Sequence, residues 1–444
     1  MTEAPTLEPR PKIELADLRE AWLLLDSEDR VFGFRSLDPA DADDFFLSLT
    51  TRDQRDLVLN LPPGERRLWL RLLPPDDAAD LLQDASEEER SELLAQLDAA
   101  TQHDVRALLA YAEDDAGGLM NPRYARVRPE MSAEEAIAYI RRQIKEQPGS
   151  LNYAYVIDAD QHLEGVISFR QLFGMTPEQK IRDVMRPDLV TVPETMDQEE
   201  VSRLFAQHHL LAIPVIDAHG RMKGVVTADD IVEVVREEAT EDIQKIGGTA
   251  ALNAPYLQVG IMGMIRRRAG WLSALFLGEM LTATAMTYFQ NEIAKAVVLA
   301  LFVPLVISSG GNSGSQATTL VIRAMALGEV RLRDWWRVIR REFFSGLGLG
   351  LILGTIGVLR ILTWQSIFHT YGSHGIVVAI TVGLSLVGVV LWGTLSGSVL
   401  PFLLKRLGFD PASASAPFVA TFVDVTGLII YFTTARMIMK GTLL

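Results

Sequence analysis

The chain has 444 residues, no cysteine and a formal net charge of −15 at pH 7. The absence of cysteine excludes disulfides and thiolate metal sites. Residues 256–444 carry 15 basic and 7 acidic residues, a net of +8, which leaves 27 basic and 50 acidic residues, a net of −23, for residues 1–255. The acidic half argues against binding to nucleic acid or an anionic membrane surface, because both would repel it.

Residues 1–122 are expected to form a helical domain. Apolar residues recur there at helical spacing, and the pairs Pro62-Pro63 and Pro74-Pro75 interrupt the pattern. Ser86, followed by three glutamates, is a typical helix N-cap. Short helices with short links indicate a helical superhelix. The first nine residues show no basic stretch followed by an apolar one, so we expect no signal peptide.

Residues 123–228 change to alternating strands and helices, and the pattern occurs twice. In the first copy, Tyr153-Ala-Tyr-Val-Ile-Asp-Ala-Asp precedes Gly165-Val-Ile-Ser-Phe-Arg-Gln-Leu. In the second, Ala212-Ile-Pro-Val-Ile-Asp-Ala-His precedes Gly224-Val-Val-Thr-Ala-Asp-Asp-Ile. Each copy predicts a strand, a polar turn, and a second strand leading into a capped helix. The duplication resembles a tandem pair of cystathionine-β-synthase-type (CBS) modules.

The resemblance to CBS modules implies a regulatory role and a nucleotide site. Such pairs often bind adenine nucleotides at a motif of glycine, two apolar residues, Ser or Thr, two further residues and Asp. The second copy fits, with Thr227 in the phosphate-binding place and Asp230 in the ribose-binding place. The first copy has Ser168 but carries Gln171 where the motif has Asp. The motif therefore allows at most one site for a nucleotide such as ATP.

Residues 229–255 are expected to form an acidic linker. Residues 229–245 have the pattern of one amphipathic helix, and Gly247-Gly248 predicts a break after it. This helix would lead from the acidic half of the chain toward the apolar half.

Residues 256–444 contain five apolar stretches long enough to cross a bilayer, at about 268–289, 294–325, 343–363, 376–402 and 412–436. The strongly basic segments all fall on one side of the predicted membrane, which is also the side of residues 1–255. The positive-inside rule therefore predicts a cytoplasmic soluble half and an outer C-terminus. Glycines at a spacing of four, such as Gly346 and Gly350 or Gly393 and Gly397, indicate close helix packing.

Asp424 lies in the otherwise apolar stretch 417–431 of the last span. A carboxylate at membrane depth costs about 2.5–3.5 kcal/mol on insertion scales, so it usually faces a pore, a partner or a wet cavity. Ala420, Thr421 and Gly427 share its helical face, which is small and weakly polar. The alternative is a structural Asp that is protonated or hydrogen-bonded internally.

The second span contains the polar segment 308–316, Ser-Ser-Gly-Gly-Asn-Ser-Gly-Ser-Gln, which we interpret as a break in the helix. The free carbonyls of such a break, with the side chains of Asn312 and Gln316, would offer oxygen ligands to a hydrated hard cation. Glu279 in the first span is a second intramembrane carboxylate. It would lie either near the pore, in an accessory role, or at a helix interface.

Two segments carry a closer resemblance. Gly-Gly-Asn-Ser-Gly-Ser-Gln (310–316) and Pro-Phe-Val-Ala-Thr-Phe-Val-Asp-Val-Thr-Gly (417–427) resemble the signature segments of the MgtE family of bacterial magnesium channels. The order of parts is also similar: a helical-superhelix N domain, an α+β CBS pair, a linker (plug) helix and an all-α membrane domain of five helices. The resemblance covers nearly the whole chain. It implies a multi-pass protein of the bacterial plasma (inner) membrane that conducts Mg²⁺ and is not an enzyme.

The resemblance also implies roles for individual residues. Family members are homodimers with a pore at the subunit interface. There the residue matching Asp424 holds hydrated Mg²⁺, helped by the position of Asn312 and by backbone oxygens near Ala420. Two such carboxylates, one from each subunit, would hydrogen-bond to a hexahydrated ion without stripping its water. The chain departs from the family at Ala416, where some members have Asn, so that side chain contributes nothing here.

In the family, cytosolic Mg²⁺ binds between the N domain, the CBS pair and the linker helix and closes the pore. Physically, apposed carboxylates repel each other at low Mg²⁺ and are bridged at high Mg²⁺, which shifts a closed–open equilibrium. The regulatory candidates are the acidic residues of the linker helix: Asp229, Asp230, Glu233, Glu237, Glu238, Glu241 and Asp242.

Two other classes of function compete with a channel. A proton- or sodium-coupled divalent cation carrier would use Asp424 or Glu279 as a titrating group. An intramembrane enzyme is disfavoured, because the sequence has no His-Glu-x-x-His motif, no Gly-x-Ser-x-Gly motif and no Cys nucleophile. The sequence also lacks a Walker-type phosphate loop, which agrees with passive flow.

Overall fold

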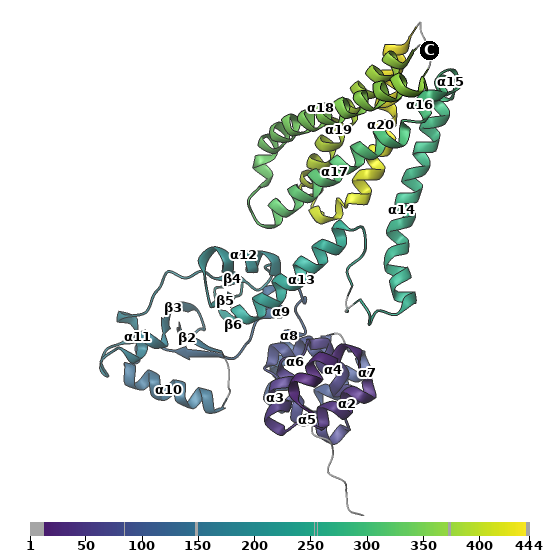
Figure 1. The fold of residues 1–444 in the computed structure, drawn as a ribbon. Helices are drawn as coiled ribbons and strands as arrows, with labels where there is room; N and C mark the ends of the chain where they lie inside the picture. Colours follow the sequence, from purple (N-terminus) through teal and green to yellow (C-terminus); the bar gives the residue numbers. More distant parts are fainter. Residues whose placement is uncertain are drawn as a thin grey trace, which may run out of the picture. The chain divides into compact units, whose positions relative to one another are not determined.

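The structure is a computed structural model that describes residues 13–83, 85–146, 150–252, 254, 256–371 and 374–440. The chain forms two compact units, Met1–Arg236 and Glu237–Leu444, here called the N-terminal unit and the membrane unit (Figure 1). The first nine residues, on which the expectation about a signal peptide rests, lie outside the described residues.

Short helices build the first part of the N-terminal unit, as the sequence predicted. They are α1 (Leu15–Ala21), α2 (Ser27–Arg35), α3 (Pro39–Leu47), α4 (Thr51–Asn60), α5 (Pro63–Leu70), α6 (Pro75–Gln83), α7 (Glu87–Leu94), α8 (Ala99–Leu108) and α9 (Ala116–Leu119), with a 3₁₀ turn η1 (Trp22–Leu24). The expected cap is confirmed, because Ser86 and Glu89 form a capping box at the start of α7. Phe34, Phe45 and Phe46, each at most 1% exposed, lie in the core that holds these helices together.

The two strand–helix copies form matching three-stranded sheets, with strand orders β1-β2-β3 and β4-β5-β6. Within each sheet the first pair of strands is parallel and the second antiparallel, so the predicted duplication is confirmed. The elements are β1 (Tyr124–Val127), α10 (Ala133–Glu146), β2 (Ser150–Ile157), β3 (Leu163–Ser168), α11 (Phe169–Phe173), η2 (Ile181–Asp183), β4 (Val192–Pro193), α12 (Gln198–His208), β5 (Ala212–Ile216) and β6 (Met222–Thr227).

The second sheet shares one apolar core with the short helices. Val192, Phe205 and Ile213 belong to the same buried cluster as Leu70 and Leu81. After β6 the chain continues into α13 (Ala228–Ile246), which matches the predicted linker helix. The predicted break follows it, where Gly248 takes a left-handed conformation with φ of 73°.

Five helices in the membrane unit are long and apolar enough to cross a bilayer, as the sequence predicted. They run over Ile261–Tyr288, Val297–Ala326, Leu332–Phe368, Gly375–Arg406 and Ala416–Met439. Their main helical segments are α14 (Ile261–Tyr288), α17 (Val303–Ala326), α18 (Trp335–Phe368), α19 (Gly375–Arg406) and α20 (Ala416–Met439), joined by α15 (Gln290–Lys295), α16 (Val297–Ala300), η3 (Leu332–Asp334) and η5 (Pro411–Ser413). The first and third begin several residues earlier than expected, because basic residues extend these helices beyond the apolar stretch that hydropathy detects.

The predicted break in the second span is wrong. The segment 308–316 lies inside α17, which is helical from Val303 to Ala326. The irregular backbone falls earlier, at Ala296 and between α16 and α17. The carbonyls of the polar segment therefore belong to a continuous helix, and the oxygen ligands it can offer are its side chains.

The glycines of this segment serve close packing instead. A Cβ on Gly310 would lie 2.9 Å from Cγ1 of Val423, and a Cβ on Gly314 would lie 2.9 Å from the carbonyl oxygen of Gly393. Side chains at these positions would push α17 away from α19 and α20. The predicted packing role of the other glycines is confirmed, because a Cβ on Gly350 would lie 2.9 Å from the backbone of Val387.

Candidate functional site

A cavity of about 440 Å³ opens between α14, α17 and α20 in the membrane unit. Ten residues line it: Glu279, Thr282, Val303, Pro304, Ile307, Ser308, Gly311, Asn312, Ala420 and Asp424. The four pore residues predicted from sequence are all in this set, although they come from three different helices. The cavity therefore combines two carboxylates, an amide and two hydroxyls with an apolar wall.

Local contacts hold the helices around this cavity. Ser415 caps α20, and its hydroxyl also accepts a hydrogen bond from the Trp271 indole of α14 at 3.2 Å. The Ser315 hydroxyl of α17 donates to the carbonyl of Ala416 at 3.1 Å. Gly311 faces the carboxylate, because a Cβ built there would lie 3.7 Å from Oδ1 of Asp424. The absence of a side chain at Gly311 thus keeps space open in front of Asp424.

The sequence interpretation missed part of the cavity and included residues outside its lining. Gln316, Thr421 and Gly427 do not line it. Thr282, one helical turn from Glu279, does line it and was not singled out. Its hydroxyl is buried and has no hydrogen-bond partner within the described part of the chain. Its signal in the sequence is the i, i+3 spacing from Glu279, which places both on one face of a helix.

A second group of carboxylates lies in the N-terminal unit, where α6 approaches the start of α13. Asp76 and Asp77 come from α6, and Asp229, Asp230 and Glu233 come from α13; we call these five residues the acidic cluster. Asp76 is 6% exposed, and its Oδ1 accepts a hydrogen bond from the Asn121 amide at 3.1 Å. The three predicted α13 residues are thus joined by Asp76 and Asp77. Asp80 of α6 lies beside the cluster, because burial and the charges of Asp76 and Asp77 raise its pKa, and the sequence interpretation missed all three α6 residues.

Electrostatics sets the acidic cluster apart from ordinary surface carboxylates. Burial, together with the charges of Asp230, Glu233 and Asp229, raises the pKa of Asp77 to about 7. Burial is also the main cause that raises the pKa of Asp230 to about 6. Burial and the neighbouring charges of Asp77 and Asp230 raise the pKa of Asp76 well above its usual range. These carboxylates therefore repel one another when ionised, and a divalent cation would relieve that repulsion.

The remaining regulatory candidates lie further along α13, in the membrane unit. They are Glu237, Glu238, Glu241 and Asp242. Glu241 forms an ion pair with Lys245, whose Nζ also contacts Oδ2 of Asp410 at 2.7 Å. Glu241 is therefore already neutralised by a cation within its own helix.

The predicted nucleotide motif acts as a helix cap in both CBS copies. Oδ2 of Asp230 accepts hydrogen bonds from the backbone N–H and the hydroxyl of Thr227, at 3.1 and 2.7 Å. Ser168 and Gln171 form the corresponding capping box in the first copy. The departure at Gln171 thus preserves the cap, and nucleotide binding at Thr227 and Asp230 stays a prediction.

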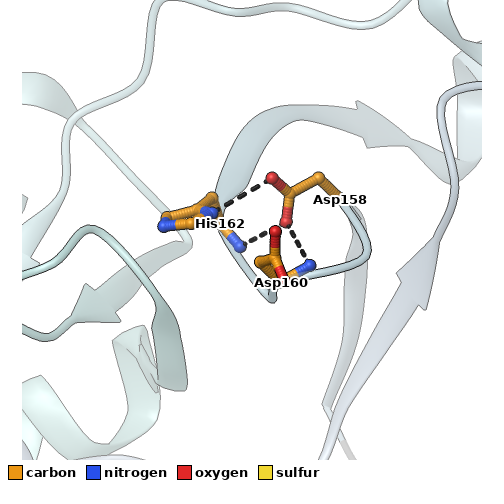
Figure 2. Close-up of side chains that lie close together, drawn as sticks. All are labelled: Asp158, Asp160 and His162. Atoms are coloured by element: carbon orange, nitrogen blue, oxygen red, sulfur yellow. Dashed lines mark hydrogen bonds and ion pairs between the residues drawn. The ribbon is translucent and has the colours of Figure 1, made fainter.

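Asp158, Asp160 and His162 also gather closely enough to suggest a metal site (Figure 2). Oδ1 of Asp158 accepts hydrogen bonds from the backbone N–H groups of Asp160 and His162, at 2.8 and 2.9 Å. The second copy repeats this turn with Asp217, which accepts from the backbone N–H groups of His219 and Arg221. The grouping is therefore a turn that connects two strands, and its geometry needs no metal.

Comparisons with known proteins agree with this architecture. Residues 303–434 match the MgtE divalent cation transporter family, residues 13–114 match the MgtE intracellular N domain, and residues 116–175 and 181–237 match CBS domains. The cytosolic domain of the Mg²⁺ channel MgtE in complex with ATP is a similar solved structure, with 36% identity, 50% of this chain and 91% of that chain covered, and a TM-score of 0.46.

Curated relatives extend the match across most of the chain. The magnesium transporter MgtE of Bacillus subtilis is 33% identical, over 76% of this chain and 73% of the relative. An inosine-5′-monophosphate dehydrogenase of Rhizobium tropici matches only 31% of this chain, so the similarity to this enzyme is partial. The magnesium transporter MgtE of Thermus thermophilus is 40% identical, over 78% of this chain and 74% of the relative. The chain therefore belongs to the MgtE family of magnesium transporters, and it is a membrane transporter of divalent cations and not an enzyme.

Proposed function

We propose that the chain forms a Mg²⁺-selective channel in which hydrated Mg²⁺ passes the cavity between α14, α17 and α20. The observation that carries the proposal is the meeting of Asp424, Asn312 and Glu279, from three helices, around one cavity of about 440 Å³. Mg²⁺ keeps several of its waters and prefers octahedral oxygen coordination. The carboxylate of Asp424 would accept hydrogen bonds from these waters, and the Asn312 amide would support them. The backbone of Ala420 lies inside the continuous helix α20, so this residue would contribute mainly the space that its small side chain leaves in the cavity.

The proposed pore is completed by a second copy of the chain. No residue of α14 is buried within the single described chain, and Glu279 on this helix is exposed. A homodimer would place a second Asp424 across the symmetry axis and close the open side of the cavity. Two facing carboxylates would balance the charge of one divalent ion while leaving its water in place.

We further propose that Mg²⁺ closes this pore by binding at the acidic cluster. Five carboxylates meet there, and burial with their mutual repulsion raises the pKa of Asp76, Asp77 and Asp230. The helix α13 leads from this cluster into the membrane unit. Bridging Asp77 to Asp230 with Mg²⁺ would fix the start of α13 against α6. Because the same helix continues into the membrane unit, its position would couple the bound ion to the pore.

The positions of the basic residues support the orientation that we propose for the chain in the membrane. Arg266, Arg337 and Lys405 lie at the same ends of the membrane-spanning helices as the connection to α13. The positive-inside rule then gives a cytoplasmic N-terminal unit in the bacterial plasma membrane, with the C-terminus outside after five spans.

A coupled carrier is the second candidate, because Glu279 and Asp424 share one cavity and either one can exchange a proton. The two mechanisms differ in what drives transport. A channel moves Mg²⁺ down its own electrochemical gradient, whereas a carrier stops when the coupling gradient of protons or sodium is removed.

Mg²⁺ flux into proteoliposomes tests these proposals. The wild type is compared with Asp424→Ala and with Glu292→Gln, which removes a carboxylate outside the cavity lining. We expect undiminished flux without proton or sodium gradients, closure as Mg²⁺ rises on the α13 side, and loss of flux in Asp424→Ala alone. Flux that requires a proton or sodium gradient would favour the carrier, and normal flux in Asp424→Ala would remove Asp424 from the pathway.

A further inference from the structure

A second cavity, of about 650 Å³, lies in the membrane unit where α13 ends and α14 begins. It is separate from the cavity between α14, α17 and α20, which we call the transport cavity, and it shares none of its lining residues. Its walls come from the end of α13, the following turn, the start of α14 and the turn η5: Lys245, Gly248, Thr249, Ala250, Arg266, Arg267, Gly270, Trp271 and Ser413. Three of these nine residues are basic.

The wall formed by the turn after α13 is held in place by hydrogen bonds. The backbone N–H groups of Gly248 and Thr249 donate to the carbonyls of Lys245 and Gln244, at 2.9 and 3.0 Å. Gly248 has a positive φ, and a Cβ there would lie 2.8 Å from the Trp271 ring, so only glycine fits. This cavity is therefore a formed part of the fold and not a gap beside a loose loop.

The three basic side chains differ in the hydrogen bonds and ion pairs that they already form within the protein. Lys245 pairs with Asp410 and Glu241. Arg267 donates a hydrogen bond to the carbonyl of Ala251, which orients its guanidinium. Arg266 makes neither a hydrogen bond nor an ion pair with any residue that the structure describes. The cavity thus presents the charge of Arg266 beside hydroxyl groups and without an acidic lining residue.

The surroundings of the cavity are those of a membrane surface. Arg266 and Arg267 lie in the basic first part of α14, and Trp271 begins its apolar part. Basic residues and tryptophan are typical of the level of lipid headgroups. Leu277 and Leu281 share the helical face of Arg266 and Gly270, which is turned away from Glu279. Their side chains are 64% and 58% exposed, and an acyl chain would cover them, whereas a free phosphate ion would not.

We propose that this cavity binds the phosphate group of an anionic phospholipid from the leaflet on the α13 side. Arg266 and Arg267 donate hydrogen bonds to the phosphate oxygens, as guanidinium groups do in other phosphate sites. Thr249 and Ser413 line the same cavity. The Thr249 hydroxyl donates to the carbonyl of Gln244, so it is left to accept a hydrogen bond from the lipid headgroup. The indole N–H of Trp271 already donates to Ser415, so what Trp271 offers the lipid is its apolar ring, which packs against the start of the acyl chain. The proposal is independent of the transport mechanism, since none of these residues lines the transport cavity.

Binding of individual lipids to the full-length protein tests the proposal. The protein is purified in neutral detergent, phosphatidylglycerol or phosphatidylcholine is added, and native mass spectrometry measures each dissociation constant. We expect phosphatidylglycerol to bind more tightly to the wild type and Arg266→Gln to weaken it by about tenfold, because a charge-assisted hydrogen bond is lost. Arg266→Lys keeps the charge but not the planar geometry and should fall between the two.

Arg268→Gln is the matched control. It removes the same charge from the same basic segment, but Arg268 does not line the cavity. We expect its affinity for phosphatidylglycerol to stay within about twofold of the wild type, because a neutral micelle provides no surface potential. Equal losses in Arg266→Gln and Arg268→Gln would overturn the site, since they would indicate diffuse attraction. A thermal unfolding midpoint of Arg266→Gln equal to that of the wild type in detergent alone separates lost binding from lost folding.

Soluble phosphates distinguish the source of the phosphate group. Inorganic phosphate and glycerol 3-phosphate are added at the same concentrations as the lipid, and the displacement of bound phosphatidylglycerol is measured. We expect little displacement, because these ions lack the acyl chains that cover Leu277 and Leu281. Displacement at concentrations comparable with the lipid would overturn the assignment to a lipid. Failure of phosphatidylglycerol to bind more tightly than phosphatidylcholine would overturn the proposal as a whole.

Discussion

The transport cavity and the acidic cluster are both built around carboxylates, but they differ in how many charges they crowd together. Within one chain, two carboxylates, Glu279 and Asp424, share the cavity of about 440 Å³ with an amide and hydroxyls, and the proposed homodimer would add the second chain's pair across the axis. Five carboxylates meet in the acidic cluster, where burial and mutual repulsion raise the pKa of Asp77 to about 7. An ion that must leave again needs weak contacts, whereas a regulatory ion gains affinity from a high ligand charge. The difference in crowding therefore supports the proposed division, with passage at the cavity and sensing at the acidic cluster.

Replacing one Asp with Asn should have a different consequence in each of the two regions. Asp424→Asn should lower Mg²⁺ flux by at least about 100-fold, because charge-assisted hydrogen bonds to the hydrated ion, each worth about 1.5–3 kcal/mol, would be lost in both copies of the proposed homodimer. Asp77→Asn should keep the maximal flux and raise the Mg²⁺ concentration needed for closure by about tenfold, because one ligand charge is lost. Flux assays in proteoliposomes over a range of Mg²⁺ on the α13 side measure both quantities. A fall in maximal flux in Asp77→Asn would erase the distinction between the two regions.

The residues of the transport cavity could be predicted from the sequence more completely than those of the acidic cluster. Asp424 interrupts an apolar stretch, so a single residue predicted a functional site in the last span, and all four predicted pore residues line one cavity. Asp76 and Asp77 are 2 of 50 acidic residues in the first 255, and nothing local distinguishes them. Their burial against α13 depends on the fold, which the repeat pattern of short helices did not specify. The polar segment of α17 was misread as a break, because glycines that open a helix and glycines that pack it look alike in sequence.

The packing of α17 against α19 can be disturbed without changing the charges of the transport cavity. Gly393→Ala would insert a methyl group against the backbone of Gly310, so we expect it to destabilise the membrane unit by about 1–3 kcal/mol. Gly348→Ala is the matched control, because a Cβ there meets nothing within 4 Å, and the gain in helix propensity should leave stability equal or slightly higher. Thermal unfolding in detergent, with flux measured in parallel, compares the two variants. Equal unfolding midpoints would contradict the tight contact between α17 and α19.

Charge repulsion in the acidic cluster predicts that the free energy of unfolding in Mg²⁺-free buffer falls as pH rises. The pKa of Asp77 is raised from 3.8 to about 7 by folding, so the folded state holds a proton that the unfolded state has lost between these values. The contribution of Asp77 to stability therefore falls as pH rises from about 4 to about 7. Asp77→Asn should stabilise the protein at pH 8 by at least about 1.4 kcal/mol, the value of one pKa unit, and have little effect at pH 4. Calorimetry in EDTA measures the difference at each pH.

Asp43→Asn is the control for this experiment, because Asp43 is exposed on α3 of the same unit. It should change stability little, and equally at both pH values. Adding Mg²⁺ should stabilise the wild type more than Asp77→Asn, because the ion would bridge the charges that the substitution removes. A destabilising effect of Asp77→Asn at pH 8 without Mg²⁺ would show that the cluster is not repulsive.

The smallest expected effect tests whether stability and sensing can be separated within the N-terminal unit. Ser86 caps α7 through a box with Glu89, at a place where neither residue belongs to the acidic cluster. Ser86→Ala should cost about 1 kcal/mol of stability, the usual value of an N-cap. It should leave the Mg²⁺ concentration for closure unchanged, because the shape of α6 and the start of α13 does not depend on this cap. Thermal unfolding and Mg²⁺ flux, measured on the same preparation, give the stability and the Mg²⁺ concentration for closure. A shift in closure as large as that of Asp77→Asn would mean that any loss of stability in this unit opens the pore, and the acidic cluster would lose its special role.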